Sequence, residues 1–418
     1  MNVHPITQAN FKGYDARPLK GFLMSSNCHG IAEEMRTIGN IEGFKIYAII
    51  GDSLKQKCTE AIPKYEISST KLWAQDYWSI VKNKLFSLEN NKKEEAIRKF
   101  FKLKTDFTQE IDRHTPKLKN LNDSLLENQK KINANLEKKE LMTLINKSQS
   151  ILDKIRETER EIHIPGGNLF LAKDKFNKDV AIVGEKDTRH YSPDEIIDMY
   201  DVDNIVILPQ MDFHIDLFIR PLNNGKVLLA DDNLTLNYLI DGLKKLKNHI
   251  VSLPINERKK YSKIFAKLYA EAEKFKNNMD ANKLAKANEV AKILENNNFE
   301  VIRVPARIYE YCQVVNSDDF LKHKCNYLNA NVLINDKGEL VYITNKSTFD
   351  SQLGLTPEIS KELNFSFEKN FVDIISNYMD VKHFYFVNGE DNFIANEMLP
   401  EFSGGIHCAC AEIPKSLK

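Results

Sequence analysis

Short apolar runs bounded by turn residues recur along this chain and predict β-strands, because β-branched and aromatic residues in such runs favour extended backbone. The runs are residues 21–24, 44–50, 179–183, 204–208, 226–230, 299–304, 331–334, 339–343 and 384–387. Helical patterns fall between them, for example over residues 30–38 and 357–363. Strands that alternate with helices predict an α/β fold rather than an all-helical one.

Two long segments interrupt this alternation and predict helical insertions. No glycine occurs between Gly51 and Gly166, and leucine and isoleucine recur there among lysine, glutamate and asparagine. The spacing is typical of an amphipathic helix or a helical hairpin, which we predict over residues 88–163. Residues 234–298 hold one glycine and one proline among strong helix formers and predict a second insertion. Solvated helices packed on the main body are the favoured interpretation of both, with recognition of a protein partner as the alternative.

Charge and hydropathy narrow the classes of function. The chain has 418 residues, and its 59 lysine and arginine residues are balanced by 59 aspartate and glutamate residues. A dedicated nucleic-acid-binding protein usually carries a basic surplus, so we expect no nucleic-acid partner. No apolar run approaches the roughly 20 residues of a membrane span, and the first residues lack the basic-then-apolar layout of a secretory signal. We expect a cytoplasmic protein, with export by a route that needs no signal peptide left open.

The six cysteines are too sparse for a disulfide scaffold and indicate reduced thiols. They are Cys28, Cys58, Cys312, Cys325, Cys408 and Cys410. The C-x-C pair near the C-terminus lacks the second Cys or His pair of a zinc site, so we expect no metal. Cys408 follows Gly404 and Gly405, and paired glycines let the backbone approach a ligand closely. This thiol can therefore be an inert buried side chain or a nucleophile.

Two motifs set a carboxylate beside groups that suit a cationic ligand. His214 and Asp216 form an H-x-D motif, and on a strand, where side chains alternate between faces, they would share one face. Asp76 lies among aromatic residues that include Trp73. A carboxylate and ring faces together suit a planar cation. Each motif also has a structural interpretation, as a surface His–Asp pair and as an aromatic core patch in which Asp76 is a cap or turn residue.

Two further segments form turns that lead into predicted strands. Residues 166–168 read Gly-Gly-Asn before an apolar run, and Tyr327 and Asn329 precede the strand at 331–334. Neither segment alone indicates a particular function.

Taken in chain order, these motifs resemble those of the guanidino-group-modifying (pentein) superfamily, and within it the agmatine deiminases and bacterial peptidyl-arginine deiminases. The motifs that carry the resemblance are Trp73-Ala-Gln-Asp76, Gly166-Gly167-Asn168, His214-Ile-Asp216, Tyr327-Leu-Asn329 and Gly404-Gly405-Ile-His407-Cys408. The resemblance spans nearly the whole chain apart from the two insertions. It implies one catalytic domain over residues 1–418, folded as a five-bladed α/β propeller with two helical insertions and its active site on the central axis.

The resemblance also implies roles for individual residues. Asp76 and Asp216 would clamp a guanidinium group, Cys408 would be the nucleophile and His214 the general acid and base. Trp73, Asn329 and Gly405 would contact the substrate, and no metal or organic cofactor would be needed. Three places depart from the family pattern. Gln75 replaces an arginine, Trp78-Ser79 replaces a glycine-proline pair that often follows the first acid, and Pro165 replaces the glutamate that usually precedes the paired glycines.

The sequence therefore predicts a guanidine deiminase that acts on peptidyl-arginine or an agmatine-like substrate. An arginine-containing protein or peptide is slightly favoured over a small guanidine, because the insertions add surface near the first motif. Two alternatives stay open: an amidinotransferase that uses the same covalent intermediate, and a non-catalytic pentein that binds a partner through its helices. A Cys-His-Asp protease or transglutaminase ranks lower, because neither needs a second acid in an aromatic setting.

Overall fold

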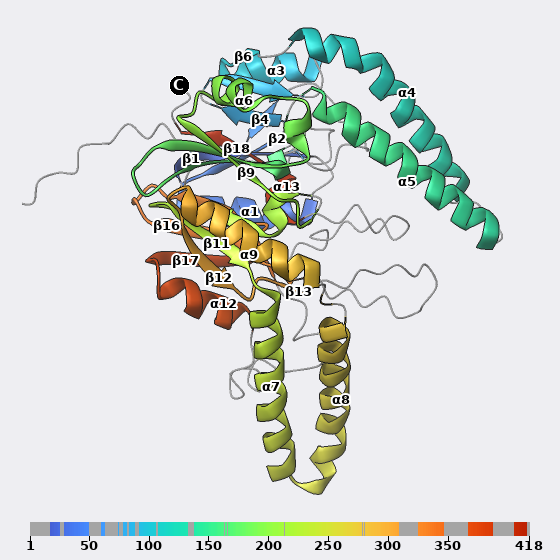
Figure 1. Cartoon of the computed structure of the whole chain (residues 1–418), viewed down its shortest axis with the longest axis vertical. Helices are drawn as coiled ribbons and strands as arrows, with labels where there is room; N and C mark the ends of the chain where they lie inside the picture. Colours follow the sequence, from blue (N-terminus) through green and yellow to red (C-terminus); the bar gives the residue numbers. More distant parts are fainter. Residues whose placement is uncertain are drawn as a thin grey trace, which may run out of the picture.

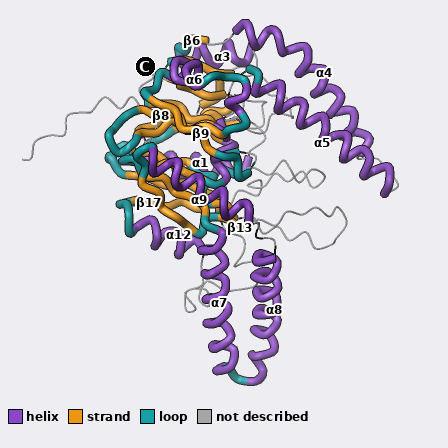
Figure 2. The backbone as a smooth tube through the Cα atoms, in the orientation of Figure 1, coloured by secondary structure: helices purple, strands orange, loops and turns teal. Residues whose placement is uncertain are grey.

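A computed structural model describes the chain over residues 17–25, 29–49, 60–62, 74, 78–81, 83–87, 92–105, 108–132, 138–162, 164, 166–212, 214–277, 279, 281–308, 325–346, 367–387 and 405–415. Strands gather in the main body and helices surround it (Figure 2). The fold is α/β with mixed sheets.

The strands of the described residues repeat one connectivity, in which an antiparallel pair is followed by a helix and a parallel third strand. In the first unit, β4 (Trp78–Val81) pairs antiparallel with β5 (Lys84–Ser87), and after α3 (Lys92–Phe101) the chain returns as β6 (Lys104–Thr105), parallel to β5. A parallel return needs a crossover, which the helix provides.

The second unit has the same order over residues 169–208. Strand β7 (Leu169–Lys173) pairs antiparallel with β8 (Asp179–Gly184), and α6 (Pro193–Tyr200) leads to β9 (Asn204–Leu208), which is parallel to β8. Ser192 caps α6 in a capping box with Glu195, which explains why the helix begins at Pro193.

The third unit carries the second insertion inside its crossover. Strand β10 (Ile219–Pro221) pairs antiparallel with β11 (Lys226–Ala230), and β12 (Glu300–Val304) lies parallel to β11. Between them run α7 (Asp232–Ser252), α8 (Ile255–Asn277) and α9 (Ala281–Asn296). Short strands β13 (Arg307–Ile308) and β14 (Cys325–Asn326) pair antiparallel and lead to the fourth unit.

The fourth and fifth units share a sheet. Strand β15 (Asn331–Ile334) pairs antiparallel with β16 (Leu340–Asn345), and α12 (Phe367–Ser376) leads to β17 (Val381–Val387), which is parallel to β16.

The fifth unit joins segments from both ends of the described chain. Strand β18 (Cys410–Pro414) pairs antiparallel with β1 (Arg17–Ser25), and α1 (His29–Glu42) leads to β2 (Lys45–Ile49), parallel to β1. Parallel pairing of β1 with β15 joins the two units, and β3 (Glu60–Ile62) extends the sheet beyond β2.

Two helical hairpins extend from the body in different directions (Figure 1). Helices α4 (Thr108–Ile132) and α5 (Lys138–Arg160) pack together through Leu118, Leu125, Ile151 and Ile155. Within 88–163 this hairpin begins only after β6, because α3 and β6 belong to the first unit.

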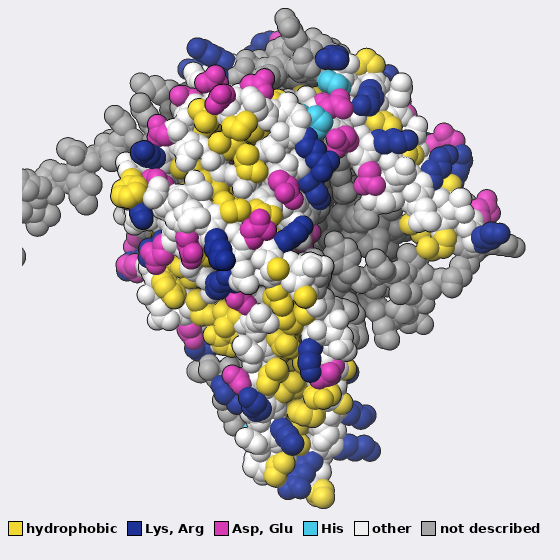
Figure 3. Space-filling model, in the orientation of Figure 1, with side chains coloured by type: hydrophobic (Ala, Val, Ile, Leu, Met, Phe, Trp, Pro, Cys, Tyr) yellow, Lys and Arg dark blue, Asp and Glu magenta, His cyan; other side chains and the backbone are white. Residues whose placement is uncertain are grey.

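In the second hairpin, α7 and α8 run side by side away from the sheets, whereas α9 packs on β9, β11 and β12. Segment 234–298 therefore supplies both a projecting hairpin and a crossover helix. Basic and acidic side chains are interspersed over the face in Figure 3, as the balanced composition leads one to expect. No helix in the described part of the chain is long and apolar enough to cross a membrane.

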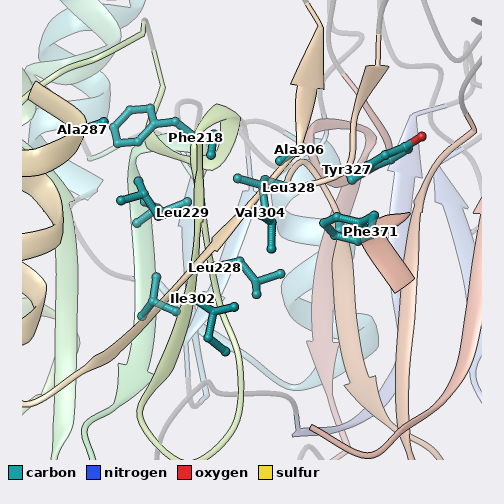
Figure 4. Close-up of a cluster of buried hydrophobic side chains, with 14 of the residues drawn as sticks. Phe218, Leu228, Leu229, Ala287, Ile302, Val304, Ala306, Tyr327, Leu328 and Phe371 are labelled. Carbon is teal, nitrogen blue, oxygen red and sulfur yellow. The ribbon is translucent and has the colours of Figure 1, made fainter. Parts of the chain in front are cut away.

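The largest apolar core joins the third unit to the fourth. Figure 4 shows side chains of β11 and β12, such as Leu228 and Ile302, opposite Tyr327 and Phe371. Burial of such large side chains contributes roughly 1.5–3 kcal/mol each. The core thus holds the segment that leads into β10 and the segment that leads into β15 in fixed positions relative to each other.

All nine predicted strand runs are confirmed, since each overlaps one of β1, β2, β8, β9, β11, β12, β15, β16 and β17. The helix predicted over 30–38 is confirmed as part of α1, and residues 357–363 lie outside the described residues. The arrangement of the repeated units as five blades around one axis stays a prediction.

A buried carboxylate links α1 to β17. Glu42 is only 2% exposed, and its carboxylate accepts hydrogen bonds from Asn335, Tyr385 and His383. Burial by itself would raise the pKa of Glu42, but these hydrogen bonds outweigh it and hold the pKa below its usual value of 4.5. A carboxyl whose pKa is lowered on folding stabilises the fold above its unfolded pKa, and that contribution is lost as the pH falls through the folded value.

We predict that Glu42→Gln lowers the free energy of unfolding by about 1–3 kcal/mol at a pH of about 7, because a hydrogen-bonded charge becomes neutral. The difference from the wild type should shrink as the pH falls below about 4.5, because this carboxyl is then protonated first in the unfolded chain and, at lower pH still, in the folded protein. Urea unfolding at both pH values measures this. Glu127→Gln, at an exposed Glu127–Lys131 pair, is the matched control and should show no comparable loss. An equal deficit at both pH values would contradict the linkage.

Candidate active site

The C-terminal segment separates its two cysteines into different environments. Cys408 lies in the short helix α13 (Ile406–Ala409), is 3% exposed and faces polar groups. Cys410 begins β18, pairs with Met24 of β1 and packs in an apolar cluster. A thiol among apolar side chains is a structural group, whereas one beside polar groups can do chemistry.

Asp216 lies at the centre of the polar cluster. It belongs to the 3-10 turn η4 (Ile215–Leu217), just before β10, and is 0% exposed. Its Oδ2 lies 2.8 Å from Asn329 Nδ2, 2.8 Å from His407 Nδ1 and 3.5 Å from Cys408 Sγ. A buried carboxylate is tolerated only when its neighbours donate hydrogen bonds to it.

Asn329 connects the carboxylate, the thiol and the backbone of α13. Its Nδ2 donates to Asp216 and lies 3.1 Å from Cys408 Sγ, and its Oδ1 accepts from the backbone N–H of His407 at 3.0 Å. Because an amide has a fixed donor side and a fixed acceptor side, these contacts hold it in one orientation. Asn329 therefore sets the distance between Asp216 and Cys408.

A second amide, Asn345, holds the backbone around Asn329. Its Nδ2 donates to the carbonyls of Asn326 and Asn329, and its Oδ1 accepts from the N–H of Ile406. Gly405 packs against both amides, and a Cβ there would collide with Asn329 Oδ1 and Asn345 Nδ2. The structure thus shows a packing requirement for glycine at 405, and substrate contact by Gly405 stays a prediction.

His214 lies beside this cluster, but not on a strand. Its backbone is extended, and residues 215–217 turn into η4, so the prediction that His214 and Asp216 share one face of a strand is wrong. The reason is that the N–H of Ile215 donates to Asn168 Oδ1 instead of to a neighbouring strand, while the N–H of Phe218 donates back to the carbonyl of Ile215.

The Gly-Gly-Asn motif supports the turn at residues 215–217. Residues 166–168 form the 3-10 turn η2 (Gly166–Asn168) and lead into β7, as predicted. Asn168 Oδ1 accepts from Ile215 N and from Gln210 Nε2, both at 2.9 Å. Gly167 packs so closely on the His214 ring that a Cβ would collide with Nδ1. The motif therefore positions both the H-x-D segment and its imidazole.

His407 is a site residue that the sequence did not single out. Its Nδ1 contacts Asp216, and its ring stacks on Phe170, with centroids 5.4 Å apart and planes 24° apart. Burial lowers the pKa of His407 well below 6.5, and the charges of Arg220 and His214 lower it further. Burial and both neighbouring positive charges thus act against a proton on this ring. Its place directly before Cys408 was the available signal.

Arg220 was also missed by sequence reasoning. Its guanidinium is buried, lies 5.1 Å from the centroid of the Phe170 ring and has Nη2 3.5 Å from Glu412 Oε1. The available signal in the sequence was its position on β10, four residues after Asp216. A basic residue on a strand is far more often exposed than buried, so this position did not indicate a site residue.

Trp73 and Asp76 lie outside the described residues, so the second acid of the predicted clamp has no described contacts. Ala74, between them, is buried in an apolar cluster with Trp78. Among the described side chains, no group of three or more His, Cys, Asp or Glu residues could hold a metal ion.

The site residues occupy equivalent places in the repeated units. Each lies one to three positions before the first residue of the first strand in its unit. This holds for Asn168, Asp216, Asn329 and Cys408. Asp76 stands in the same relation to β4, which begins at Trp78. Segments far apart in the chain thus supply one residue each from corresponding connections.

Comparison with known proteins identifies no close relative. No family model matches the chain, and no curated protein sequence matches it. Among solved structures, the agmatine deiminase of C. jejuni is similar over 97% of this chain and 96% of that chain, at 11% sequence identity and a TM-score of 0.48. A likeness at this level assigns neither a family nor an activity to this chain.

We predict that Asn168→Ala destabilises the protein by about 2–4 kcal/mol, because two buried donors, Ile215 N and Gln210 Nε2, lose their acceptor. Chemical unfolding measures the loss. Asn122→Ala is the matched control, since Asn122 bonds only the carbonyl one turn earlier on α4 and should change stability far less. Equal losses in the two variants would show that Asn168 is not a special support of the turn.

Proposed function

We propose that this protein is a guanidine deiminase that converts a guanidinium group to a ureido group and ammonia through a covalent intermediate on Cys408. We further propose that its five repeated units are the blades of a pentein-type propeller. The observation that carries the proposal is the buried cluster of Asp216, Asn329, His407 and Cys408, contributed by three separate segments. A thiol, an anion and an imidazole in contact are groups that such chemistry uses.

The charge of the cluster favours a cationic substrate. A carboxylate 3.5 Å from the Cys408 sulfur opposes loss of the thiol proton. A guanidinium bound against Asp216 would offset that negative charge and favour the thiolate at the moment of attack. The nucleophile would thus be activated by the substrate it acts on.

Asp216 would bind the guanidinium through charge-assisted hydrogen bonds, which hold a planar cation in a fixed orientation. We assign Asp76 to the opposite edge, because it precedes β4 as the other site residues precede their strands. Trp73 would form a wall of this half of the site. Two anions on one cation leave its central carbon open to attack from the side of Cys408.

In the first half of the reaction, the Cys408 thiolate forms a bond to the guanidinium carbon. His214, as imidazolium, donates a proton to the departing nitrogen, and the C–N bond breaks to release ammonia. An amidino group is left on the sulfur. In the second half, neutral His214 takes a proton from water, and the water oxygen bonds to the same carbon. The C–S bond breaks and the ureido product leaves, with the hydroxyl proton passing to ammonia. The sum is guanidinium plus water giving ureido product plus ammonium.

We predict that Cys408→Ala lowers ammonia release by at least about 1,000-fold, because the covalent route loses its nucleophile. An ammonia assay paired with colorimetric detection of ureido groups measures it, with agmatine and an arginine-containing peptide tested side by side. Turnover of agmatine alone would remove the slight preference for a peptidyl substrate.

Cys410→Ser is the matched control, because this cysteine lies in the apolar core two residues away. It should keep its activity. Retained activity in Cys408→Ala, or an inactive Cys410→Ser with an intact fold, would overturn the assignment.

Two further measurements separate the other activities. Reaction in ¹⁸O-labelled water should place the label in the ureido product, whereas an amidino transfer to an amine leaves the product unlabelled. A haloacetamidine, which mimics the guanidinium, should modify Cys408. A protein that leaves every guanidine unchanged and whose Cys408 does not react with this reagent is a binding protein instead.

A further inference from the structure

Three buried side chains, two of which share the Phe170 ring as a contact, lie next to Asp216. The Arg220 guanidinium lies over the Phe170 ring, the same ring stacks with His407, and His407 contacts Asp216 through Nδ1. Relative exposures are 5% for Arg220, 8% for Phe170 and 3% for His407. Water is therefore largely excluded from the whole arrangement, and its charges act on one another with little screening.

The charges around His407 do not favour protonation of its ring. Arg220 and His214 oppose a proton on this ring, and Asp216, 2.8 Å away, attracts one. Glu412 pairs with Arg220, and Cys408, next to His407 in the chain, is a further titratable neighbour among the described residues. Burial adds to the opposition, because a desolvated imidazolium loses its hydration.

A protonated His407 would form an ion pair with Asp216. That pair would use the negative charge that binds a cation and would place a second positive charge against the incoming substrate. A neutral His407 instead donates one hydrogen bond and leaves the carboxylate its full charge. The difference matters most in a buried site, where each charge is weakly screened.

We propose that His407 is a positioning residue that donates Nδ1–H to Asp216 as a neutral imidazole, and that Arg220, which lies over the same Phe170 ring, is the buried cation that keeps it neutral. This inference rests on the proposed function only in its purpose, which is to keep Asp216 available to a cationic substrate. The tautomer and charge of His407 are properties of the protein without substrate.

Long-range ¹H–¹⁵N spectra of the full-length protein labelled with [¹⁵N]histidine test the inference directly. The His407 signals are identified by their loss in His407→Asn. The expected result is an Nδ1–H neutral ring that does not titrate between a pH of about 8 and about 5.5. An Nε2–H tautomer, or a charged ring at a pH of about 7, would overturn the proposal.

The role of Arg220 is tested in two variants, because removal of one member of a buried ion pair can unfold a protein. These are Arg220→Met and the double variant Arg220→Gln with Glu412→Gln, which removes the pair together. In either, the His407 ring should take up a proton between a pH of about 8 and about 5.5, the range in which the wild-type ring stays neutral. Lys173→Met is the matched control, since Lys173 lies on the same strand as Phe170 but pairs with Asp179. A ring that stays neutral over this range in every folded Arg220 variant, or one that is protonated equally in the control, would refute the role.

The activity readout compares two amides at 407. Asparagine places its Nδ2 near the position of His Nδ1, and glutamine does not. His407→Gln should therefore lose about 30-fold in kcat, and His407→Asn should recover most of that loss. Equal defects would show that the ring is needed for packing and not for its donor. If no guanidine is hydrolysed at all, the proposed function fails, while the spectra still decide the state of His407.

Discussion

The buried negative charge of Asp216 is the constraint on which the arrangement of the site depends. An ionised carboxylate with no exposure costs several kcal/mol unless it receives hydrogen bonds, and Asn329 and His407 supply them. Each donor is itself held. The amide of Asn329 is fixed by the backbone of His407, and the ring of His407 by Phe170. The contacts that stabilise the Asp216 carboxylate are therefore the same contacts that set the geometry at the Cys408 thiol.

Amide side chains supply many of these contacts, because each carries both a hydrogen-bond donor and an acceptor and no charge. Asn168, Asn329 and Asn345 each bond a backbone group of another segment, and none is exposed by more than 1%. A network of neutral groups fixes loops without adding further buried charges. This explains why irregular backbone can be buried beside the site, where unpaired N–H and carbonyl groups would be costly.

The repeated connectivity explains how distant segments meet. Each unit enters its first strand through a short connection, and the residues of the site lie on these connections, at Asn168, Asp216, Asn329 and Cys408. The strands of each unit hold the connection at one end, and the shared core around Phe371 and Leu228 fixes one unit against the next. Functional residues on loops that a rigid scaffold positions are a general solution, since loops can vary while the core stays packed.

The sequence by itself determined the local elements and the residue types. Strand runs such as 204–208 and 331–334 were predictable because their apolar, β-branched pattern acts over neighbouring residues. The H-x-D and Gly-Gly-Asn motifs lie in the segments that supply Asp216 and Asn168 to the buried polar cluster. Only the tertiary structure decided that 215–217 turn instead of extending, since the acceptor for Ile215 N–H is Asn168, 47 positions earlier in the chain. It also separated Cys408 from Cys410 and brought Arg220, Phe170 and His407 together. Those outcomes depend on which distant groups meet in a buried space, and no local pattern encodes that.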